Sequence, residues 1–174
     1  MKMNSMKNIR IEKITLNIGS GKDQTRLEKS LVLLNAITNA TPIKTTTNKR
    51  IQEWGLRPGL PIGCKLTLRK ERAVQILPRL LDAVDKRLRY KQFDENGNIA
   101  FGIREYIDIP GVKYDPKIGI MGLEVCITLE RPGYRIKRRR LLVRKIPARH
   151  RISKQEAMDF MTQKFKIIIE EEQI

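Results

Sequence analysis

The residues with the clearest chemistry form one basic run near the C-terminal end of the chain. Residues 131–151 read RPGYRIKRRRLLVRKIPARHR, with ten Lys or Arg and no Asp or Glu. Guanidinium groups are planar forks that suit phosphate oxygens, so this composition predicts a polyanionic partner. The formal net charge of +17 over 174 residues favours a nucleic acid. A membrane surface is less suitable, because neither a long apolar span nor an amphipathic helix with aromatic anchors accompanies the run.

Apolar residues are interleaved with these cations, which distinguishes the run from a solvated tail. We therefore expect one side of the segment to pack on a folded body while the guanidinium groups face outward. The apolar residues expected to pack are Tyr134, Ile136, Leu141, Leu142, Val143 and Ile146. Arg138, Arg139 and Arg140 form its densest cationic stretch and are candidate phosphate contacts.

The sequence contains fragments that resemble catalytic motifs, but their spacing or their sequence context does not fit catalysis. GSGK at residues 19–22 resembles part of a phosphate-binding loop, but Leu16 and Asp23 occupy positions where that loop needs Gly and Ser or Thr. Acidic residues such as Asp94 lie in turns, where carboxylates commonly cap backbone amides. His150 lies between two arginines, whose field favours the neutral imidazole and suits an RNA contact better than catalysis. We expect no catalytic residues.

No metal, cofactor or small-molecule substrate is expected either, since the chain has one histidine and no CxxC spacing. Cys64 and Cys126 lie among apolar and β-branched residues, so both are predicted to be buried thiols in strands. Residues 1–7 lack the apolar core of a signal peptide, and nothing is long enough to span a bilayer. This predicts a cytoplasmic protein.

Strand and helix patterns alternate along the chain. Apolar alternation predicts strands at 14–18, 64–69, 99–103 and 123–129, and a Thr-rich stretch favours another at 43–50. Helical spacing predicts helices at 27–37, at 71–88 with a kink or break near Leu77 caused by Pro78, and after the capping-box pair Ser153 and Glu156. We predict one α+β domain over residues 1–174. It has a mainly antiparallel sheet with helices packed on one face, long projecting loops and the basic segment.

Polar side chains on the strands and two glycine-proline loops complete the candidate surface. The strand 64–69 places Leu66 and Leu68 toward the core and leaves Thr67 and Arg69 on a basic, hydroxylated face. Loops at 54–63 and 109–122 should project, and loops of this kind are commonly functional. Because aromatic residues are only 5% of the chain, recognition should depend on phosphate, sugar and shape contacts.

Four blocks of sequence are specific enough to suggest a family. IEKITLNIGSG (11–21), LRPGLPIGCKLTLR (56–69), FDENGNIAFGIREY (93–106) and IPGVKYD (109–115) resemble, in the same order, blocks of universal large-subunit ribosomal protein five, the family that holds 5S rRNA. The resemblance covers most of residues 9–130. The tail from RPGYRIKRRR to HRISKQEA is similar to the archaeal and eukaryotic branch.

This resemblance implies a non-enzymatic α+β protein in the central protuberance of the cytoplasmic ribosome. Its implied partners are 5S rRNA, large-subunit rRNA, P-site tRNA and neighbouring ribosomal proteins. The rRNA-binding candidates combine sheet positions that the family implies with outward polar and basic residues of this chain: Lys13, Asn17, Thr46, Thr47, Lys49, Thr67, Arg69, Arg138, Arg139 and Arg140. The family also implies that a loop contacts the tRNA elbow, here Trp54, Gly55, Leu56, Arg57, Pro58 and Gly59.

Two other readings belong to different classes. An RNA-modifying or phosphoryl-transfer enzyme with a basic substrate groove would require a nucleotide fingerprint or paired catalytic carboxylates. A DNA-binding architectural protein would prefer duplex DNA to folded RNA.

Overall fold

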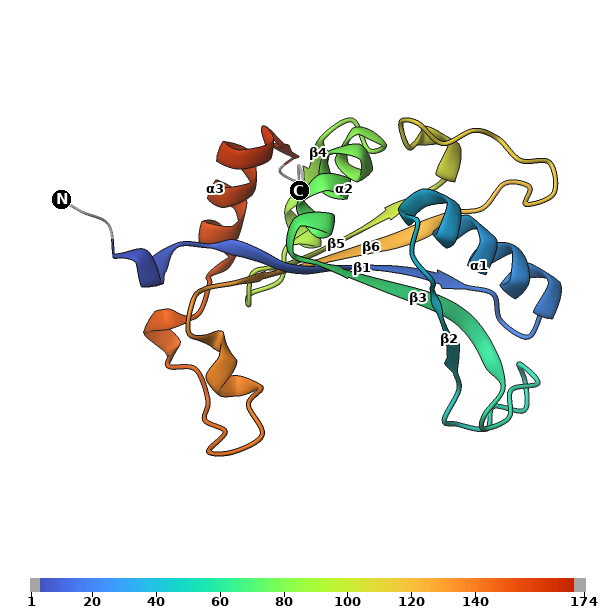
Figure 1. The fold of residues 1–174 in the computed structure, drawn as a ribbon, viewed down its shortest axis with the longest axis horizontal. Coiled ribbons are helices and arrows are strands. Elements are labelled where there is room, and N and C mark those ends of the chain that lie inside the picture. Colours follow the sequence, from blue (N-terminus) through green and yellow to red (C-terminus); the bar gives the residue numbers. More distant parts are fainter. Residues whose placement is uncertain (1–3, 171–174) are drawn as a thin grey trace.

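The computed structural model describes residues 4–170 and has the predicted α+β architecture (Figure 1). Its strands are β1 (Arg10–Gly19), β2 (Ile43–Thr46), β3 (Pro61–Arg69), β4 (Arg87–Arg89), β5 (Asn98–Ile103), β6 (Leu123–Glu130) and β7 (Ile168–Glu170). Its α-helices are α1 (Gln24–Thr38), α2 (Lys70–Asp82) and α3 (Lys154–Phe165). The main sheet is antiparallel with strand order β2-β3-β1-β6-β5, and β4 pairs in parallel with β7.

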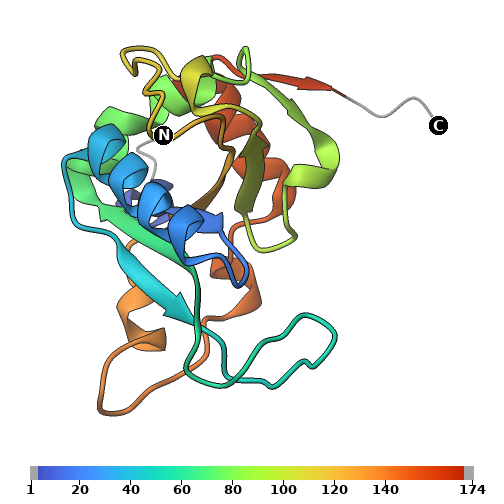
Figure 2. The ribbon, with the colours of Figure 1, turned by 90° about the vertical axis from the view of Figure 1, so that its right-hand side faces the viewer.

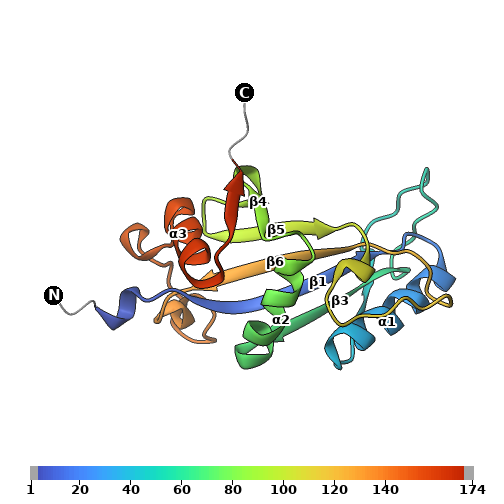
Figure 3. The same ribbon diagram turned by 90° about the horizontal axis from the view of Figure 1, so that it is seen from above.

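The helices cover one face of the main sheet, and the other face remains open. Figures 1 and 3 show α1, α2 and α3 on the same side of the strands. Alternating strand residues such as Leu16, Leu66 and Val125 point toward these helices and are buried. The open face therefore carries the polar half of each strand pattern.

A β-bulge sets the phase of β1. Its pairing with β6 shifts register between Ile11 and Lys13, so Ile11 and Ile14 both reach the core although they are three residues apart. From Ile14 onward the strand alternates regularly. The bulge is what allows Lys13 and the next polar residues to face away from the helices.

Helix α1 is capped at its N-terminus by Asp23, whose carboxylate accepts hydrogen bonds from the backbone N–H groups of Thr25 and Arg26. The side-chain hydrogen bond from Thr25 is the main reason that the pKa of Asp23 lies below its ordinary value. The helix ends at Asn39, which adopts a left-handed conformation with φ of 51°. The helix predicted at 27–37 is thus confirmed, and in the structure it extends from Gln24 to Thr38.

The predicted break in the second helix is wrong. Helix α2 continues through Pro78 and ends at Asp82, while Leu88 lies in the short strand β4. Pro78 is exposed, so the carbonyl of Val74, which proline cannot bond, can bond water instead. Leu88 is buried, but it lies in β4. It also falls at helical spacing after the apolar residues of α2, so the sequence pattern extended the predicted helix to it.

Two long segments extend from the open side of the sheet. Figures 1 and 2 show that the β2–β3 loop (residues 47–60) and the basic segment (residues 131–151) project on the side opposite the helices. Strand β2 ends at Thr46, earlier than the predicted 43–50, so Thr47 and Lys49 lie in the loop. The open face is bordered by these two projections.

Candidate nucleic-acid interface

Strand register places the predicted sheet residues in rows across the open face. Lys13 lies opposite Arg69 on β3 and Thr128 on β6. Thr15 lies between Thr67 and Cys126, and Asn17 lies opposite Lys65 and Glu124. Paired residues of neighbouring strands point to the same face. Lys13, Asn17, Thr67 and Arg69 therefore share one surface, which we call the open face.

Cys126 is part of this open face, which corrects the prediction that both cysteines are buried. Cys64 is buried, and its burial raises the pKa of the thiol to about 11. Cys126 is exposed, because Val125 and Ile127 on either side of it face the core. Apolar neighbours in the sequence do not show on which face of a strand a residue lies. The alternation of side chains along the strand decides this, and it places Cys126 on the open face.

One acidic group reduces the positive charge of this face. The side-chain amide of Asn17 donates to Glu124 Oε2 at 3.2 Å across β1 and β6. Glu124 is exposed and Asn17 is partly exposed, so the amide can exchange this partner for an RNA acceptor. Glu124 itself disfavours a phosphate at that end of the row.

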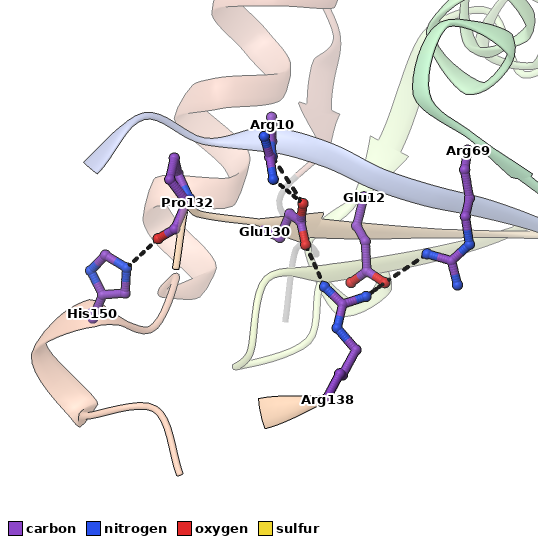
Figure 4. Close-up of polar contacts among 7 residues, drawn as sticks. All are labelled: Arg10, Glu12, Arg69, Glu130, Pro132, Arg138 and His150. Carbon is purple, nitrogen blue, oxygen red and sulfur yellow. Dashed lines mark hydrogen bonds and ion pairs between the residues drawn. The ribbon is translucent and has the colours of Figure 1, made fainter. Parts of the chain in front are cut away.

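A cluster of charges fixes the other end of the sheet (Figure 4). Glu130 accepts from Arg10 at 2.7 Å and from Arg138 at 2.6 Å. Glu12 accepts from Arg69 at 3.1 Å and also pairs with Arg138. The carboxylate side chains are only 11% and 10% exposed, whereas the three arginines are 43–63% exposed. Arg138 therefore joins the basic segment to β1 and β6 and still faces solvent.

A second set of contacts holds the two ends of the basic segment together. Arg131 is buried; it donates to Glu156 Oε1 at 2.6 Å and to the carbonyl of Arg151 at 3.2 Å. His150 Nε2 lies 2.9 Å from the carbonyl of Pro132 (Figure 4), and because a carbonyl oxygen only accepts, Nε2 is the donor of this hydrogen bond. Tyr134 donates to the carbonyl of His150. These bonds make the segment a closed loop and not a tail.

The basic segment and the open face enclose a groove of about 320 Å³. Thr128 and Asn98 on the sheet line it together with Lys137, Lys145 and Arg151 of the basic segment. Glu12 also lines the groove, so amide and hydroxyl groups lie beside three cations and one carboxylate. This arrangement suits an anionic backbone that runs along the sheet.

The apolar residues of the basic segment behave in two ways. Ile146 is buried, and Tyr134 and Ile136 are partly buried, as predicted. Leu141, Leu142 and Val143 are exposed, so the prediction that they pack on the body is wrong. The reason is geometrical: the chain leaves the sheet near Arg138 and returns at Ile146, and the residues between them extend away from the core (Figure 1).

The three predicted arginines of this segment have different surroundings. Arg138 is held by the two carboxylates, and Arg139 donates to the carbonyl of Leu142. Arg140 is exposed. No pattern in three consecutive arginines distinguishes these roles.

The β2–β3 loop is a small hairpin. Ile51 and Leu56 exchange two backbone hydrogen bonds of 3.1 and 2.9 Å. Trp54 lies at the turn with 64% of its surface exposed, while Leu56 is buried. Gly55 and Gly59 have φ values of +64° and +84°, which other residues adopt only with strain. The Trp54–Gly59 stretch therefore includes one side chain that packs inward and several groups that project.

Thr46, Thr47 and Lys49 flank this hairpin. Thr46 and Lys49 are exposed, whereas Thr47 is buried. The hydroxyl of Thr47 donates to the carbonyl of Lys49 and accepts from its N–H. Thr47 thus orients Lys49.

Carboxylates in the other loops hold turns, as their sequence context predicts. Asp94 accepts from the side chain of Asn98 at 3.0 Å, and this hydrogen bond lowers the pKa of the carboxyl. Asp115 accepts from the backbone of Lys117. Within residues 4–170, no group of three or more His, Cys, Asp or Glu residues could hold a metal ion. In the same residues, no helix is long and apolar enough to cross a membrane.

The fold and this surface are those of a scaffold protein that presents cations and polar groups, a surface chemistry that suits a nucleic acid. Two family models match the chain, ribosomal protein L5 over residues 4–57 and the C-terminus of the same ribosomal family over residues 61–160. The chain belongs to the ribosomal protein L5 family and is not an enzyme. The catalytic alternative is thereby excluded.

Similar proteins come from archaea, which confirms the predicted branch of the family. Large ribosomal subunit protein uL5 of Sulfurisphaera tokodaii is 48% identical over 170 residues, covering 97% of this chain and 96% of that protein. The protein of the same name from Nanoarchaeum equitans is 48% identical over 165 residues, covering 94% and 97%. That of Methanobrevibacter smithii is 45% identical over 165 residues, covering 95% and 97%.

Proposed function

We propose that the protein is a structural constituent of the large subunit of the cytoplasmic ribosome. It binds 5S rRNA in the central protuberance, contacts large-subunit rRNA and neighbouring ribosomal proteins, and reaches P-site tRNA through the β2–β3 loop. Relatives at 45–48% identity that carry the name of a large-subunit protein support this assignment.

The observation that carries the 5S rRNA proposal is the register of the open face. Lys13 is paired with Arg69, and Asn17 is paired with Lys65, so cations and an amide alternate within two strands. Thr67 lies between them on β3. This surface offers donors for phosphate and ribose oxygens, which suits recognition of a folded RNA by shape.

The remaining rRNA-binding candidates extend this surface toward both projections. Thr46 and Lys49 are exposed at the start of the β2–β3 loop, and Thr47 contributes by fixing Lys49. Arg138, Arg139 and Arg140 extend it along the basic segment. Arg140 is the one whose guanidinium we expect to pair with a phosphate most directly, since it is exposed and the other two make the internal bonds described above.

The tRNA proposal is supported by the chemistry of the hairpin. Trp54 supplies an exposed planar ring, and Arg57 supplies an exposed guanidinium close to it in sequence. An aromatic ring can stack on an exposed base and a guanidinium can bind a phosphate, and a folded tRNA carries both groups.

A paired substitution tests the open face. We expect Asn17→Ala with Thr67→Ala to weaken binding to purified 5S rRNA by roughly 1–3 kcal/mol, since each lost hydrogen bond contributes about 0.5–1.5 kcal/mol. The matched control is Asn35→Ala with Thr162→Ala, which removes the same two side-chain types from the exposed side of α1 and α3. Unchanged affinity in a protein that remains folded by circular dichroism would place the site elsewhere. Equal affinity of the wild type for duplex DNA would instead support the architectural-protein reading.

A further inference from the structure

The basic segment ends in an exposed aliphatic tip. Leu141 and Leu142 are each 76% exposed, and Val143 is 58% exposed. We call these three residues the apolar tip. Three consecutive large aliphatic side chains at such exposure are unusual for a soluble protein surface, and a contiguous patch of this kind commonly marks an interaction site.

The apolar tip is held in a defined shape. Arg139 reaches around the turn and donates to the carbonyl of Leu142 from Nε at 2.9 Å and from Nη2 at 2.6 Å. The N–H of Arg144 donates to the carbonyl of Ile136 at 3.2 Å, which closes the loop behind the tip. Leu142 has a φ of +52°, a conformation that a branched side chain adopts only with strain. The tip is therefore presented by its own loop and does not depend on the sheet for its shape.

The base of the same loop is anchored. Arg138 is bound by Glu12 and Glu130, and Ile146 is buried where the chain returns. The tip thus projects from a rigid support at a fixed place beside the open face. An exposed apolar group that is positioned in advance loses little conformational entropy when it binds.

The charges around the tip indicate the chemistry of its partner. Arg139 and Arg140 precede it, Arg144 and Lys145 follow it, and residues 131–151 contain no acidic side chain. A protein partner would have to surround an apolar pocket with carboxylates. Folded RNA carries both features within a few ångströms, since phosphates border every base face.

We propose that the apolar tip packs against unstacked nucleobases of a folded rRNA while the flanking cations bind phosphates on either side. A continuous A-form duplex keeps its bases stacked and its major groove narrow, so the tip requires a loop, bulge or junction. Aliphatic side chains do act as wedges against bases in other nucleic-acid complexes. The inference rests on the proposed binding of rRNA. It adds a contact to bases that is made by the apolar tip and not by the open face.

Substitution of the tip with all charges retained tests the inference. We expect Leu141→Ser, Leu142→Ser and Val143→Ser together to weaken binding to purified 5S rRNA or to purified large-subunit rRNA by about tenfold or more, through lost apolar contact. The slope of log affinity against log salt should not change, since no cation is removed. The matched control is Val32→Ser, Ile120→Ser and Ile168→Ser, three aliphatic residues that are 57–69% exposed elsewhere.

The outcomes separate the two proposals. If the wild type binds neither RNA, the proposed function itself fails. If it binds, and the tip variant binds both RNAs as tightly as the control variant does, only the inference about the tip is overturned.

A crosslink identifies the partner directly. A photoreactive leucine analogue at position 141, in protein assembled into large subunits, should crosslink to rRNA at unpaired nucleotides. Crosslinking to a ribosomal protein, or to paired nucleotides of a continuous helix, would overturn the inference.

Discussion

The Arg131 guanidinium and the Glu156 carboxylate form an ion pair of 2.6 Å that joins the start of the basic segment to the first turn of α3. Glu156 also completes the capping box with Ser153, so one carboxylate serves the helix and the segment together. The side chain of Arg131 is only 6% exposed. Its Nε is buried with no hydrogen-bond partner among the described residues, which makes the ion pair the main compensation for burying this charge.

Protonation of Glu156 should weaken this anchor. Partial burial by itself raises the pKa of the carboxyl, but hydrogen bonds from Ser153 and Arg131 outweigh it, so the pKa lies below its ordinary value of 4.5. A depressed pKa means that the stabilisation is complete above about pH 4.5 and is lost as the pH falls through the folded-state pKa. We expect Glu156→Gln to be less stable than the wild type at pH 7.

Denaturant unfolding across pH measures this effect. The difference in free energy of unfolding between wild type and Glu156→Gln should shrink toward zero as the pH falls from 7 to about 3. Glu28→Gln, an exposed substitution in α1, is the control. A difference that is the same at both pH values would mean that the charge of Glu156 does not stabilise the fold.

Removing the two carboxylates beneath Arg138 should loosen the basic segment. With Glu12→Gln and Glu130→Gln together, Arg138 no longer has an anionic partner in the cluster. Limited trypsin digestion should then cut at the arginines near residues 138–144 faster than in the wild type, because proteolysis follows local opening. Glu53→Gln with Glu95→Gln, both exposed, is the control. Equal cutting rates would show that the cluster does not order the segment.

The salt dependence of RNA binding should report on the arginines. Replacing Arg138, Arg139 and Arg140 by Gln should flatten the log–log salt slope, because each phosphate contact contributes about 0.7–0.9 to its magnitude. We expect Arg140→Gln alone to account for roughly one such contact, while Arg138 is partly neutralised by its carboxylates. A slope equal to that of the wild type in the triple variant would mean that these side chains do not contact phosphate.

Gly63 should be intolerant of a side chain, although its backbone does not need a left-handed conformation. A Cβ at this position would lie 2.6 Å from the carbonyl oxygen of Ile18 on β1. We expect Gly63→Ala to cost about 1–3 kcal/mol of stability, the range for overpacking. Gly19 is its partner across the strands and has open space at the same position, so Gly19→Ala is the matched control. Thermal unfolding of both variants tests this prediction. Similar melting temperatures for Gly63→Ala and Gly19→Ala would contradict the expected clash at Gly63.

The strands were predictable because each has one buried face. Leu123–Glu130 alternates without interruption, and its period of two residues is visible in any single sequence. The bulge between Ile11 and Lys13 could not be predicted from the sequence, since it appears only in the pairing of two strands. The end of α2 was missed because Leu88 continues the apolar spacing of the helix from a neighbouring strand.

The candidate site was predictable to a similar degree. Lys13, Asn17 and Thr67 were expected to share a face, and strand register brings them together. The contact of Arg138 with Glu12 spans 126 positions, and no local pattern indicates it. The prediction that the apolar tip packs on the body is wrong, because the apolar composition of a segment does not show how far the chain lies from the core.

The β2–β3 hairpin should be dispensable for folding and for binding 5S rRNA. Its glycines with positive φ and its exposed Trp54 contribute little to the core, and the open face lies on other strands. We expect replacement of residues 52–55 by the two-residue turn Asn-Gly, which leaves the Ile51–Leu56 bridge able to close, to lower stability by less than about 1 kcal/mol, because shortening a surface turn changes loop entropy only slightly. Purified 5S rRNA should still bind the variant. Loss of that binding would mean that the hairpin belongs to the 5S rRNA site.

The same hairpin should be needed for contact with tRNA. On assembled ribosomes, chemical probing of P-site tRNA should show that this deletion variant, with Asn-Gly in place of residues 52–55, loses protection at the elbow. Trp54→Ala should produce part of the same loss through lost stacking, whereas Trp54→Phe, which keeps an aromatic face, should retain most of the protection. If the deletion variant protects the elbow as fully as the wild type, the hairpin does not contact tRNA.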